Sequence, residues 1–383
     1  MSRRVVHVIT GLSMGGAEMM LYRLLEAHQK QGEIASEVIS LSSIGAVGER
    51  IQALGVPVRA LGMRPALPNP LLLLRLARML RQAGPDLVQT WMYHADLLGG
   101  LAARLAGIRA VAWGLHNTNL SPGGNKRTTI WTAWACARMS YVLPRGIVCC
   151  SEASRVVHAG LGYAAGKMIM IPNGFDTTMF NPDPEAAARI RAELGVVPDV
   201  PLVGIVARYH PLKDHANFIG AAAHVARQDD RARFLMVGPD IDADNIELTG
   251  LLERHGLRER ALLLGRRDDT PAVMSALDVL VSSSVGEAFP LVLGEAMACG
   301  TICVATDVGD SRLIVGDTGA VAPPSDPEAL GAGILAMLRL SPDERATRSE
   351  AARRRIEVNF KIESVAGRYA DYYDDLITRR SRQ

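Results

Sequence analysis

Short apolar segments alternate with segments of helical periodicity along the whole chain, and this alternation begins twice. The first series of predicted strands covers residues 5–10, 36–41, 86–90, 109–115, 146–150 and 168–172. The second series covers residues 201–207, 232–238, 261–264, 278–282, 301–305 and 319–322. Apolar strands joined by helices are typical of parallel sheets with helices on both faces. The sequence therefore predicts an α/β protein with two Rossmann-like domains whose parallel sheets face each other across a cleft.

A turn-rich segment at residues 173–184 separates the two series and marks a predicted domain boundary. We predict an N-terminal domain over residues 1–175 and a C-terminal domain over residues 176–362. The remaining residues, 363–383, contain a helical stretch with no strand after it, and we expect this helix to pack back across the hinge. Ligands of such sheets bind beyond the carboxyl ends of the strands, so the cleft is the expected site.

The charge balance and the cysteines exclude several classes of protein. The chain has 42 Lys and Arg against 40 Asp and Glu, which argues against a nucleic acid partner. The five cysteines are odd in number and form no C-x-x-C motif, so we expect buried free thiols in a reducing compartment. No secretory signal precedes the first strand, and no apolar run approaches the ~20 residues of a membrane span. We therefore expect a cytoplasmic protein.

Charged residues follow predicted strands at two places in the second half. Arg208 and Lys213 come directly after a strand, and their spacing suits a diphosphate, although in isolation a solvated surface pair is the simpler explanation. Glu287 precedes a short predicted helix, Glu295 lies about one turn into it, and the first N–H groups of such a helix form an anion site. These carboxylates could accept hydrogen bonds from sugar and ribose hydroxyls. For either one alone, a favourable charge near a helix N-terminus is the simpler explanation.

Together, these motifs resemble those of a known enzyme family. The segments Ser-Val-Gly-Glu-Ala-Phe-Pro (284–290) and Gly-Glu-Ala-Met-Ala-Cys-Gly (294–300) occur with the Arg208–Lys213 pair and with Ile-Pro-Asn-Gly-Phe-Asp (171–176). Over essentially the whole chain, this combination is similar to that of the retaining glycosyltransferases of family 4, which have the GT-B fold. One departure is Leu291, where many relatives carry a polar residue, and it bears on the contacts to the donor sugar.

The resemblance implies roles for the motif residues. Glu295 would hold the donor ribose, Glu287 the donor sugar, and Arg208 with Lys213 the diphosphate. The nucleotide-sugar site would then belong mainly to the C-terminal domain and the acceptor side to the N-terminal domain. The expected catalytic residues are His116, Arg208, Lys213 and Glu287. The expected donor-binding residues are Gly15, Gly16, Arg208, Lys213, Arg266, Glu287, Phe289, Pro290, Leu291, Val292 and Glu295.

Glycines and histidines near strand ends complete the predicted site in the N-terminal domain. Gly15 and Gly16 follow the first strand without the G-x-G-x-x-G spacing of a dinucleotide site. Paired glycines allow close approach of the backbone to an anion, and a tight turn that only packs helix on strand is the alternative. A lone histidine is more often structural, but His116 matches the family histidine beside the reacting sugar. The implied acceptor-side residues are His94, Asn117 and Asn173.

We expect no metal cofactor. Asp240, Asp242 and Asp244 follow a strand, and such carboxylates can bind a metal carried by a nucleotide diphosphate. However, Arg208 and Lys213 already supply positive charge to a diphosphate, so a solvated loop is the preferred interpretation. Neither C-x-x-C nor H-E-x-x-H zinc motifs occur in the sequence.

Two predicted helices, at residues 69–82 and 125–141, combine basic and apolar side chains. Helices of this kind can lie on an anionic membrane surface. Core packing with outward-reaching arginines is an equally good explanation. The residues concerned are Arg75, Arg78, Arg81, Lys126, Arg127, Trp131, Trp134 and Arg138.

The resemblance thus implies a retaining hexosyltransferase that uses a nucleotide-sugar donor, with UDP as the expected nucleotide. The expected acceptor is a saccharide, either lipid-linked or part of an exopolysaccharide or lipopolysaccharide. Peripheral contact with the cytoplasmic face of the membrane would follow from a lipid-linked acceptor. Two alternatives stay open: a nucleotide-sugar epimerase of the same two-domain fold, and a non-catalytic or NAD-dependent Rossmann protein. The second would need a glycine fingerprint that neither half supplies.

Overall fold

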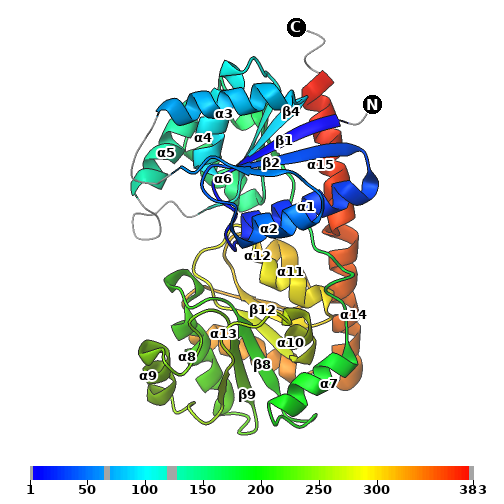
Figure 1. Cartoon of the computed structure of the whole chain (residues 1–383). Coiled ribbons are helices and arrows are strands. Elements are labelled where there is room, and N and C mark those ends of the chain that lie inside the picture. Colours follow the sequence, from blue (N-terminus) through cyan, green and yellow to red (C-terminus); the bar gives the residue numbers. More distant parts are fainter. Residues whose placement is uncertain (1–2, 64–69, 119–126, 379–383) are drawn as a thin grey trace. The chain divides into compact units, whose positions relative to one another are not determined.

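The computed structural model describes residues 3–63, 70–118 and 127–378 (Figure 1). These residues form two compact units. The N-terminal unit contains the described residues up to Gly174 and those from Ile362 onward, and the C-terminal unit is Phe175–Lys361. Each unit has its own sheet and its own core.

The N-terminal unit is built on a seven-stranded parallel sheet with the order β3-β2-β1-β4-β5-β6-β7. Its strands are β1 (Arg3–Ile9), β2 (Ile34–Ser40), β3 (Val58–Ala60), β4 (Leu87–Trp91), β5 (Val111–Leu115), β6 (Gly146–Cys149) and β7 (Met168–Met170). Its α-helices are α1 (Gly16–Gln31), α2 (Gly45–Ala53), α3 (Pro70–Ala83), α4 (Tyr93–Leu105), α5 (Arg127–Met139), α6 (Glu152–Gly160) and α15 (Ile362–Thr378).

Helices cover both faces of this sheet. Successive side chains of a strand point to opposite faces, so Val5 and Val6 of β1 enter two different cores. Val5 packs with apolar residues of α1, α2 and α15, whereas Val6 packs with those of α3, α4 and α5. Burial on both faces explains why these strands are continuous apolar runs in the sequence.

The C-terminal unit is built on a six-stranded parallel sheet with the order β10-β9-β8-β11-β12-β13. Its strands are β8 (Leu202–Val206), β9 (Arg233–Val237), β10 (Ala261–Leu263), β11 (Val279–Ser282), β12 (Ile302–Thr306) and β13 (Ala320–Ala322). Its α-helices are α7 (Pro184–Glu193), α8 (His215–Ala226), α9 (Ile246–Arg254), α10 (Thr270–Ala276), α11 (Leu291–Ala298), α12 (Ser311–Val315), α13 (Pro327–Leu338) and α14 (Pro342–Asn359).

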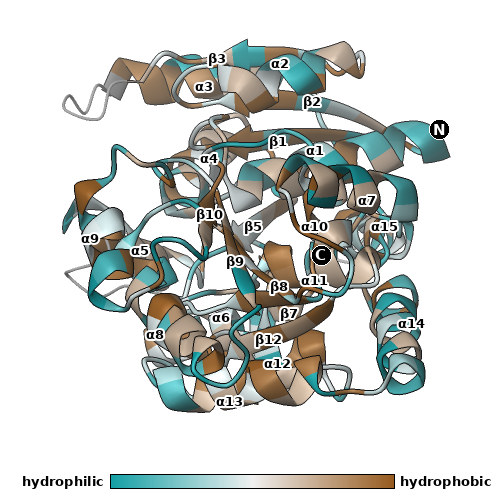
Figure 2. Cartoon of the chain, turned by 90° about the horizontal axis from the view of Figure 1, so that it is seen from below, coloured by the Kyte–Doolittle hydropathy of each residue, from teal (hydrophilic) through white to brown (hydrophobic). Residues whose placement is uncertain are grey.

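Arginines of α14 hold the carboxyl ends of three other helices in this unit. The helix is largely hydrophilic, in contrast to strands β8 and β12 (Figure 2). The last carbonyls of a helix lack intrahelical partners and attract cations. The bonds run from Arg345 to the carbonyl of Leu338 in α13 (2.9 Å), from Arg353 to that of Ala298 in α11 (2.5 Å) and from Arg355 to that of Ile314 in α12 (2.9 Å).

The predicted fold class is confirmed, because both units are Rossmann-like and contain parallel sheets. Each predicted strand has a counterpart whose ends differ by a few residues at most. The sequence did not reveal β3, a three-residue edge strand that follows Pro57 and exposes Arg59. No apolar run marks such a strand. The helix predicted near the end of the chain begins at Ile362, and residues 379–383 lie outside the described residues.

Candidate functional site

The strand order of the C-terminal sheet defines one switch point at its carboxyl edge. The chain runs outward from β8 through β9 to β10, then returns and runs outward again from β11 through β12 to β13. The chain therefore proceeds from β8 and from β11 towards opposite edges of the sheet, and ligands of open parallel sheets bind at such a switch point. Arg208 and Lys213 lie in the loop after β8, and Glu287 lies in the loop after β11.

Lys213 and Glu287 meet across these two loops. Nζ of Lys213 forms an ion pair with Oε1 of Glu287, and Oγ of Ser284 donates a hydrogen bond to the same oxygen at 2.9 Å. Two backbone-directed bonds tie the loops further: Ser283 Oγ donates to the Lys213 carbonyl at 2.8 Å, and the Val285 N–H donates to the Leu212 carbonyl at 2.9 Å. The paired side chains are only 24% and 16% exposed, so this charge-assisted bond is stronger than one on an open surface.

The loop after β8 gathers positive charge. Nδ1 of His210 accepts the N–H of Leu212 at 3.2 Å, which fixes the shape of the turn. Burial lowers the pKa of His210, and the charges of Arg208 and Lys213 lower it further. The loop ends at Asp214, whose carboxylate accepts the Asn217 N–H at 3.1 Å and caps α8. The loop thus presents two cations at the switch point, where an anionic ligand would bind.

The amino end of α11 lies in the chain directly after this ion pair. Pro290 precedes the helix, and no side chain caps its first turn, which contains Leu291 and Val292. The first N–H groups of a helix have no intrahelical partner and attract anions. Glu295 lies one turn further along and is half-buried. The helix therefore offers N–H donors at its start and a carboxylate one turn later.

Gly294 allows Phe175 to pack directly against α11. A Cβ atom at this position would collide with the ring of Phe175. Phe175 stacks on Phe289 with ring centroids 6.0 Å apart, and Phe289 meets Phe360 edge-on at 5.8 Å. Because Phe289 is only 5% exposed, its ring belongs to this aromatic core and only its backbone remains for contact with a ligand.

A third loop, after β12, approaches Glu287 and was not predicted. Gly309 has a φ of 55°, and a Cβ atom there would collide with the carbonyls of Glu287 and Ala288. The Asp310 N–H donates to the Ala288 carbonyl at 3.1 Å. The signal in the sequence is a glycine shortly after a buried strand, which often marks a close backbone approach.

Arg266 lies apart from these residues. It follows β10, which is two strands away from β8 in the sheet. Its guanidinium pairs with Asp268 at 3.6 Å, and both side chains are largely exposed. The structure therefore does not bring Arg266 to the Lys213–Glu287 pair.

The N-terminal sheet has its own switch point, between β1 and β4. Gly15 is the N-cap of α1 and Gly16 is its first residue. A Cβ atom on Gly15 would collide with the carboxylate of Glu18, which lies over this end of the helix. The pKa of Glu18 is raised by burial. A carboxylate thus lies where the paired glycines were expected to receive an anion.

His116 follows β5 and stacks on Trp91. The two ring centroids are 4.9 Å apart and the planes differ by 20°. Both ring nitrogens of His116 are buried and form no hydrogen bond within the described residues. Burial lowers the pKa of His116 to about 4, so the ring is neutral near pH 7 and offers one donor and one acceptor.

The three predicted acceptor-side residues follow different strands of the N-terminal sheet. His94 is the second residue of α4, after β4, and burial lowers its pKa. Asn117 follows β5, and its carbonyl accepts a hydrogen bond from Ser154 Oγ at 3.1 Å. Asn173 follows β7 and is 5% exposed, and its Oδ1 has no partner among the residues that the structure describes.

Two further residues at this edge were not predicted. Asp96 is fully buried, and its Oδ1 accepts hydrogen bonds from Thr90 Oγ1 at 2.5 Å and from the Gly114 N–H at 3.4 Å. Burial raises the pKa of Asp96 well above its usual range. Met92, between β4 and α4, has a φ of 71°, a conformation that is strained for a residue other than glycine. In the sequence, Asp96 looks like an ordinary acidic residue in a first helical turn, and nothing marks Met92.

Two family models match successive parts of the chain. The model of Glycosyltransferase Family 4 matches residues 14–179, and that of Glycosyl transferases group 1 matches residues 200–339. The chain belongs to glycosyltransferase family 4. The resemblance seen in the motifs is therefore confirmed. As a family 4 member, the protein is a retaining glycosyltransferase, and the predicted enzyme class is confirmed as well.

Two relatives can be aligned with this family 4 enzyme over most of their own length. EpsF of Bacillus subtilis, which is provisionally assigned as a glycosyltransferase, is 29% identical over 313 residues, 80% of this chain and 79% of its own. The UDP-Gal:alpha-D-GlcNAc-diphosphoundecaprenol alpha-1,3-galactosyltransferase of Escherichia coli is 25% identical over 313 residues, 80% of each chain. Among solved structures, Anabaena HepE in complex with UDP has a TM-score of 0.85 at 23% identity and covers 97% of this chain and 100% of its own. At this identity the match to HepE shows the fold.

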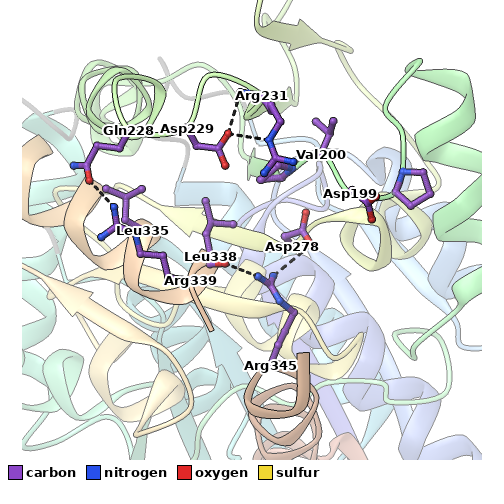
Figure 3. A pocket seen from close by; sticks show the side chains of 12 residues that line it. Asp199, Val200, Gln228, Asp229, Arg231, Asp278, Leu335, Leu338, Arg339 and Arg345 are labelled. Carbon is purple, nitrogen blue, oxygen red and sulfur yellow. Dashed lines mark hydrogen bonds and ion pairs between the residues drawn. The ribbon is translucent and has the colours of Figure 1, made fainter. Parts of the chain in front are cut away.

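A cavity of about 330 Å³ in this glycosyltransferase lies at the opposite, amino edge of the C-terminal sheet (Figure 3). Its charged side chains are largely engaged with one another. Arg345 bonds Asp278 at 3.4 Å, Arg339 donates to Gln228 at 2.6 Å, and Arg231 bonds Asp229 at 3.5 Å. Since ligands of such sheets bind at the carboxyl edge, this cavity is not the expected site of the family 4 reaction.

Other predicted features of the family 4 chain have simple structural roles. Asp242 accepts the Asp244 N–H at 3.1 Å in the turn before α9, and within the described residues no three His, Cys, Asp or Glu side chains gather as a metal site. The five cysteines are buried and free, as predicted. None of the described helices combines the length and apolar character needed to cross a membrane.

Proposed function

We propose that this enzyme transfers a hexose from a UDP-sugar to a lipid-linked saccharide in the assembly of a surface polysaccharide. The Lys213–Glu287 ion pair at the switch point, followed in the chain by the uncapped start of α11, carries the proposal. A diphosphate needs cations and N–H donors, and sugar hydroxyls need carboxylate acceptors. The C-terminal unit offers both kinds of group at the carboxyl edge of its sheet.

The roles proposed for the donor-binding residues follow from their chemistry. Arg208 and Lys213 bind the diphosphate, and the first turn of α11 from Pro290 onward adds N–H donors. Glu295 accepts hydrogen bonds from the ribose hydroxyls, and Glu287 accepts them from the donor sugar. Arg266 lies beside the base if the loop after β10 folds over it. Gly15 and Gly16 face the donor phosphate once the Glu18 carboxylate has moved.

The proposed reaction takes place on one face of the sugar. The bond between C1 and the diphosphate oxygen breaks, the acceptor oxygen bonds to C1 on the same face, and the hydroxyl proton passes to the departing phosphate. The configuration at C1 is therefore retained. Arg208, Lys213 and the α11 N–H groups stabilise the charge that develops on the diphosphate. Because these groups supply positive charge, we propose that no metal cofactor is required.

Glu287 has a binding role in this scheme. A covalent route would need a carboxylate nucleophile, as in retaining glycosidases with two carboxyl groups about 5 Å apart. The Glu287 carboxylate already accepts bonds from Lys213 and Ser284, which supports a role as an acceptor for sugar hydroxyls rather than as a nucleophile. His116 is proposed to lie beside the reacting sugar, with His94, Asn117 and Asn173 on the acceptor side.

The names of similar proteins support the choice of donor and acceptor. The Escherichia coli relative is named for UDP-galactose as donor and for a sugar linked to diphosphoundecaprenol as acceptor. HepE was solved with UDP. We propose by analogy that this chain uses a UDP-hexose and a lipid-linked glycan, in the cytoplasm at the membrane face.

The outer face of α5 supports the membrane part of the proposal. Trp131 is 76% exposed and Trp134 is 53% exposed, so both lie on the surface instead of in the core. Their spacing is that of one helical stripe, and α3 carries a second set of exposed leucines and arginines. Basic and aromatic side chains on one face suit an anionic lipid surface. We call this set the α3–α5 face: Leu71, Leu74, Arg75, Arg78, Arg81, Arg127, Trp131, Trp134, Arg138 and Tyr141; Lys126 lies outside the described residues.

Thermal unfolding with UDP, GDP, ADP and NAD, each with and without Mg²⁺, tests the donor class. A ligand at a hundred times its Kd adds about 2.7 kcal/mol, which raises the Tm by several degrees. We expect a shift with UDP that Mg²⁺ does not change and that Glu295→Ala removes. A shift with NAD alone, or with none of the four, would contradict the proposal. Conversion of a UDP-sugar to its epimer without any acceptor would favour the epimerase instead.

A further inference from the structure

The orientation of His116 depends on a ring contact rather than on a hydrogen bond. Its two ring nitrogens are buried and have no partner within the described part of the chain. Its imidazole lies nearly parallel to the indole of Trp91, with ring centroids 4.9 Å apart. The stack therefore holds the plane of the ring, while neither nitrogen is engaged by another described residue.

Trp91 is itself held firmly in the core of the N-terminal unit. It is the last residue of β4 and is fully buried. Its ring packs nearly parallel to Tyr369 of α15, with centroids 6.3 Å apart. Its indole N–H donates to Nδ1 of His7 on the neighbouring strand β1, at 3.2 Å. A tryptophan in this environment has little freedom to rotate.

The bond from Trp91 fixes the tautomer of His7. An indole N–H can only donate, so Nδ1 of His7 must be the acceptor and the ring proton must lie on Nε2. His7 is fully buried, and burial lowers its pKa to about 3, with His28 adding to this effect. His7 therefore stays neutral near pH 7 and keeps the lone pair that receives the indole proton.

We propose that Trp91, held in place by His7, is the positioning residue that sets the ring orientation of His116. The proposal rests on the proposed function, in which His116 lies beside the reacting sugar. His7, Trp91 and His116 lie on or directly after three neighbouring strands, β1, β4 and β5, at the carboxyl edge of the sheet. Trp91 acts through His116 and does not itself contact the substrate.

The test compares changes at Trp91 with the same change at a second buried tryptophan. Trp113 on β5 is also fully buried, but it belongs to the core on the other face of the sheet. Trp91→Leu and Trp113→Leu remove the same side-chain atoms from fully buried positions. Trp113→Leu therefore controls for the loss of stability. Trp91→Phe keeps an aromatic face but loses the indole N–H and part of the buried ring area. His7→Leu removes the acceptor of Trp91 and leaves its ring in place.

Two measurements are made on each variant. The first is turnover of UDP-glucose together with UDP affinity by calorimetry. The second is the NMR spectrum of histidine-labelled protein, in which the His116 signals are identified by their loss in His116→Gln. The ring current of a stacked indole shifts the signals of the imidazole beneath it, so this spectrum reports the contact directly.

We expect Trp91→Leu to lower kcat by about 10- to 100-fold, the effect of a small misplacement at a reacting centre, while UDP affinity stays within about twofold. Trp91→Phe should recover most of the loss, and His7→Leu should give an intermediate loss. The His116 signals should move in Trp91→Leu and stay in place in Trp113→Leu. Equal losses of kcat in Trp91→Leu and Trp113→Leu, or unchanged His116 signals in Trp91→Leu, would overturn the proposal. If the wild-type protein neither binds UDP nor turns over UDP-glucose, the proposed function fails, and the NMR comparison still decides whether Trp91 sets the His116 ring.

Discussion

Lys213 and Glu287 lie 74 positions apart in the sequence and form an ion pair where the loops after β8 and β11 meet. The carboxylate therefore holds the ammonium group at the switch point before any ligand arrives. A group that is already in place costs less to order when a substrate binds. In the proposed mechanism, the donor diphosphate approaches a cation whose position is set by Glu287 and by the Ser283 bond to the Lys213 carbonyl.

Lys213→Ala is expected to lower turnover far more than stability. Loss of one charge that stabilises a departing group costs about 10²- to 10³-fold in kcat. The Lys213 side chain is only 24% exposed, so its loss should lower the free energy of unfolding by about 1.5 kcal/mol, a modest part of the stability of a folded domain. Steady-state kinetics and urea unfolding measure the two effects, and Lys30→Ala on the exposed side of α1 is the control. Comparable losses of turnover and stability would remove Lys213 from the site.

Gly294→Ala is expected to damage both the aromatic core and UDP binding. The added methyl group would collide with Phe175, and overpacking of this kind costs about 1–3 kcal/mol. Displacement of α11 should also weaken UDP binding, because Glu295 is carried by the same helix. Gly250→Ala in α9 is the matched control, since the nearest atom to its new Cβ, at 3.4 Å, is the flexible end of Arg254. The hypothesis of a tight Phe175–α11 contact is wrong if both variants unfold at the same urea concentration.

Binding to anionic vesicles is expected to depend on the α3–α5 face. Wild-type protein should sediment with vesicles that contain phosphatidylglycerol and remain free with phosphatidylcholine alone, because the arginines need anionic headgroups. A double variant, Trp131→Ser with Trp134→Ser, should lose most of the bound fraction. Val358→Ser, at a position in α14 that is 67% exposed, controls for removal of surface apolar area. Equal binding by the double variant and the control would exclude this face as the lipid contact.

Mild acid is expected to destabilise the N-terminal unit. His28 and His158 are buried, and desolvation lowers the pKa of each to about 4. The unfolded chain takes up these protons near pH 6.5, whereas the folded chain does not. The free energy of unfolding therefore has its full value above pH 6.5 and falls as the pH drops towards 4. At pH 5 each of these two histidines should lower the free energy of unfolding by about 2 kcal/mol.

Urea unfolding at pH 7.5 and at pH 5 measures this loss. In His28→Asn, the free energy of unfolding should differ less between the two pH values than in the wild-type protein, whatever the stability of the variant at neutral pH. His255→Asn, which changes an exposed histidine at the end of α9, should keep the wild-type difference. A pH dependence that is identical in the His28 variant would show that other groups cause the acid sensitivity.

The sequence predicted the sheets well because burial on both faces leaves a continuous apolar run for each strand. It missed β3, where three residues at an edge carry no such run. The order of the strands is a different matter. That β8 and β11 are neighbours, and that Lys213 therefore meets Glu287, depends on where the chain reverses within the sheet, and no local pattern shows this.

The site residues divide in the same way. Charged residues that follow strands were recognisable as motifs, whereas the buried residues that hold site residues in place were not. His7 looks like any residue of a buried strand, and Trp91 looks like a core residue, because the bond between them joins strands that are distant in the sequence. Gly15 shows the opposite difficulty: two adjacent glycines suggest room for an anion, but the space is filled by Glu18 from the same helix.

The N-terminal unit owes part of its core to α15, a helix that follows the whole C-terminal unit in the sequence. Val365, Tyr369 and Tyr373 of α15 pack among the residues of α1 and β1, whereas the C-terminal unit is complete at Lys361. During synthesis on a ribosome, the N-terminal unit must therefore wait until α15 has been made to close its core. A stop codon shortly after Lys361 would therefore harm the N-terminal unit more than the C-terminal unit.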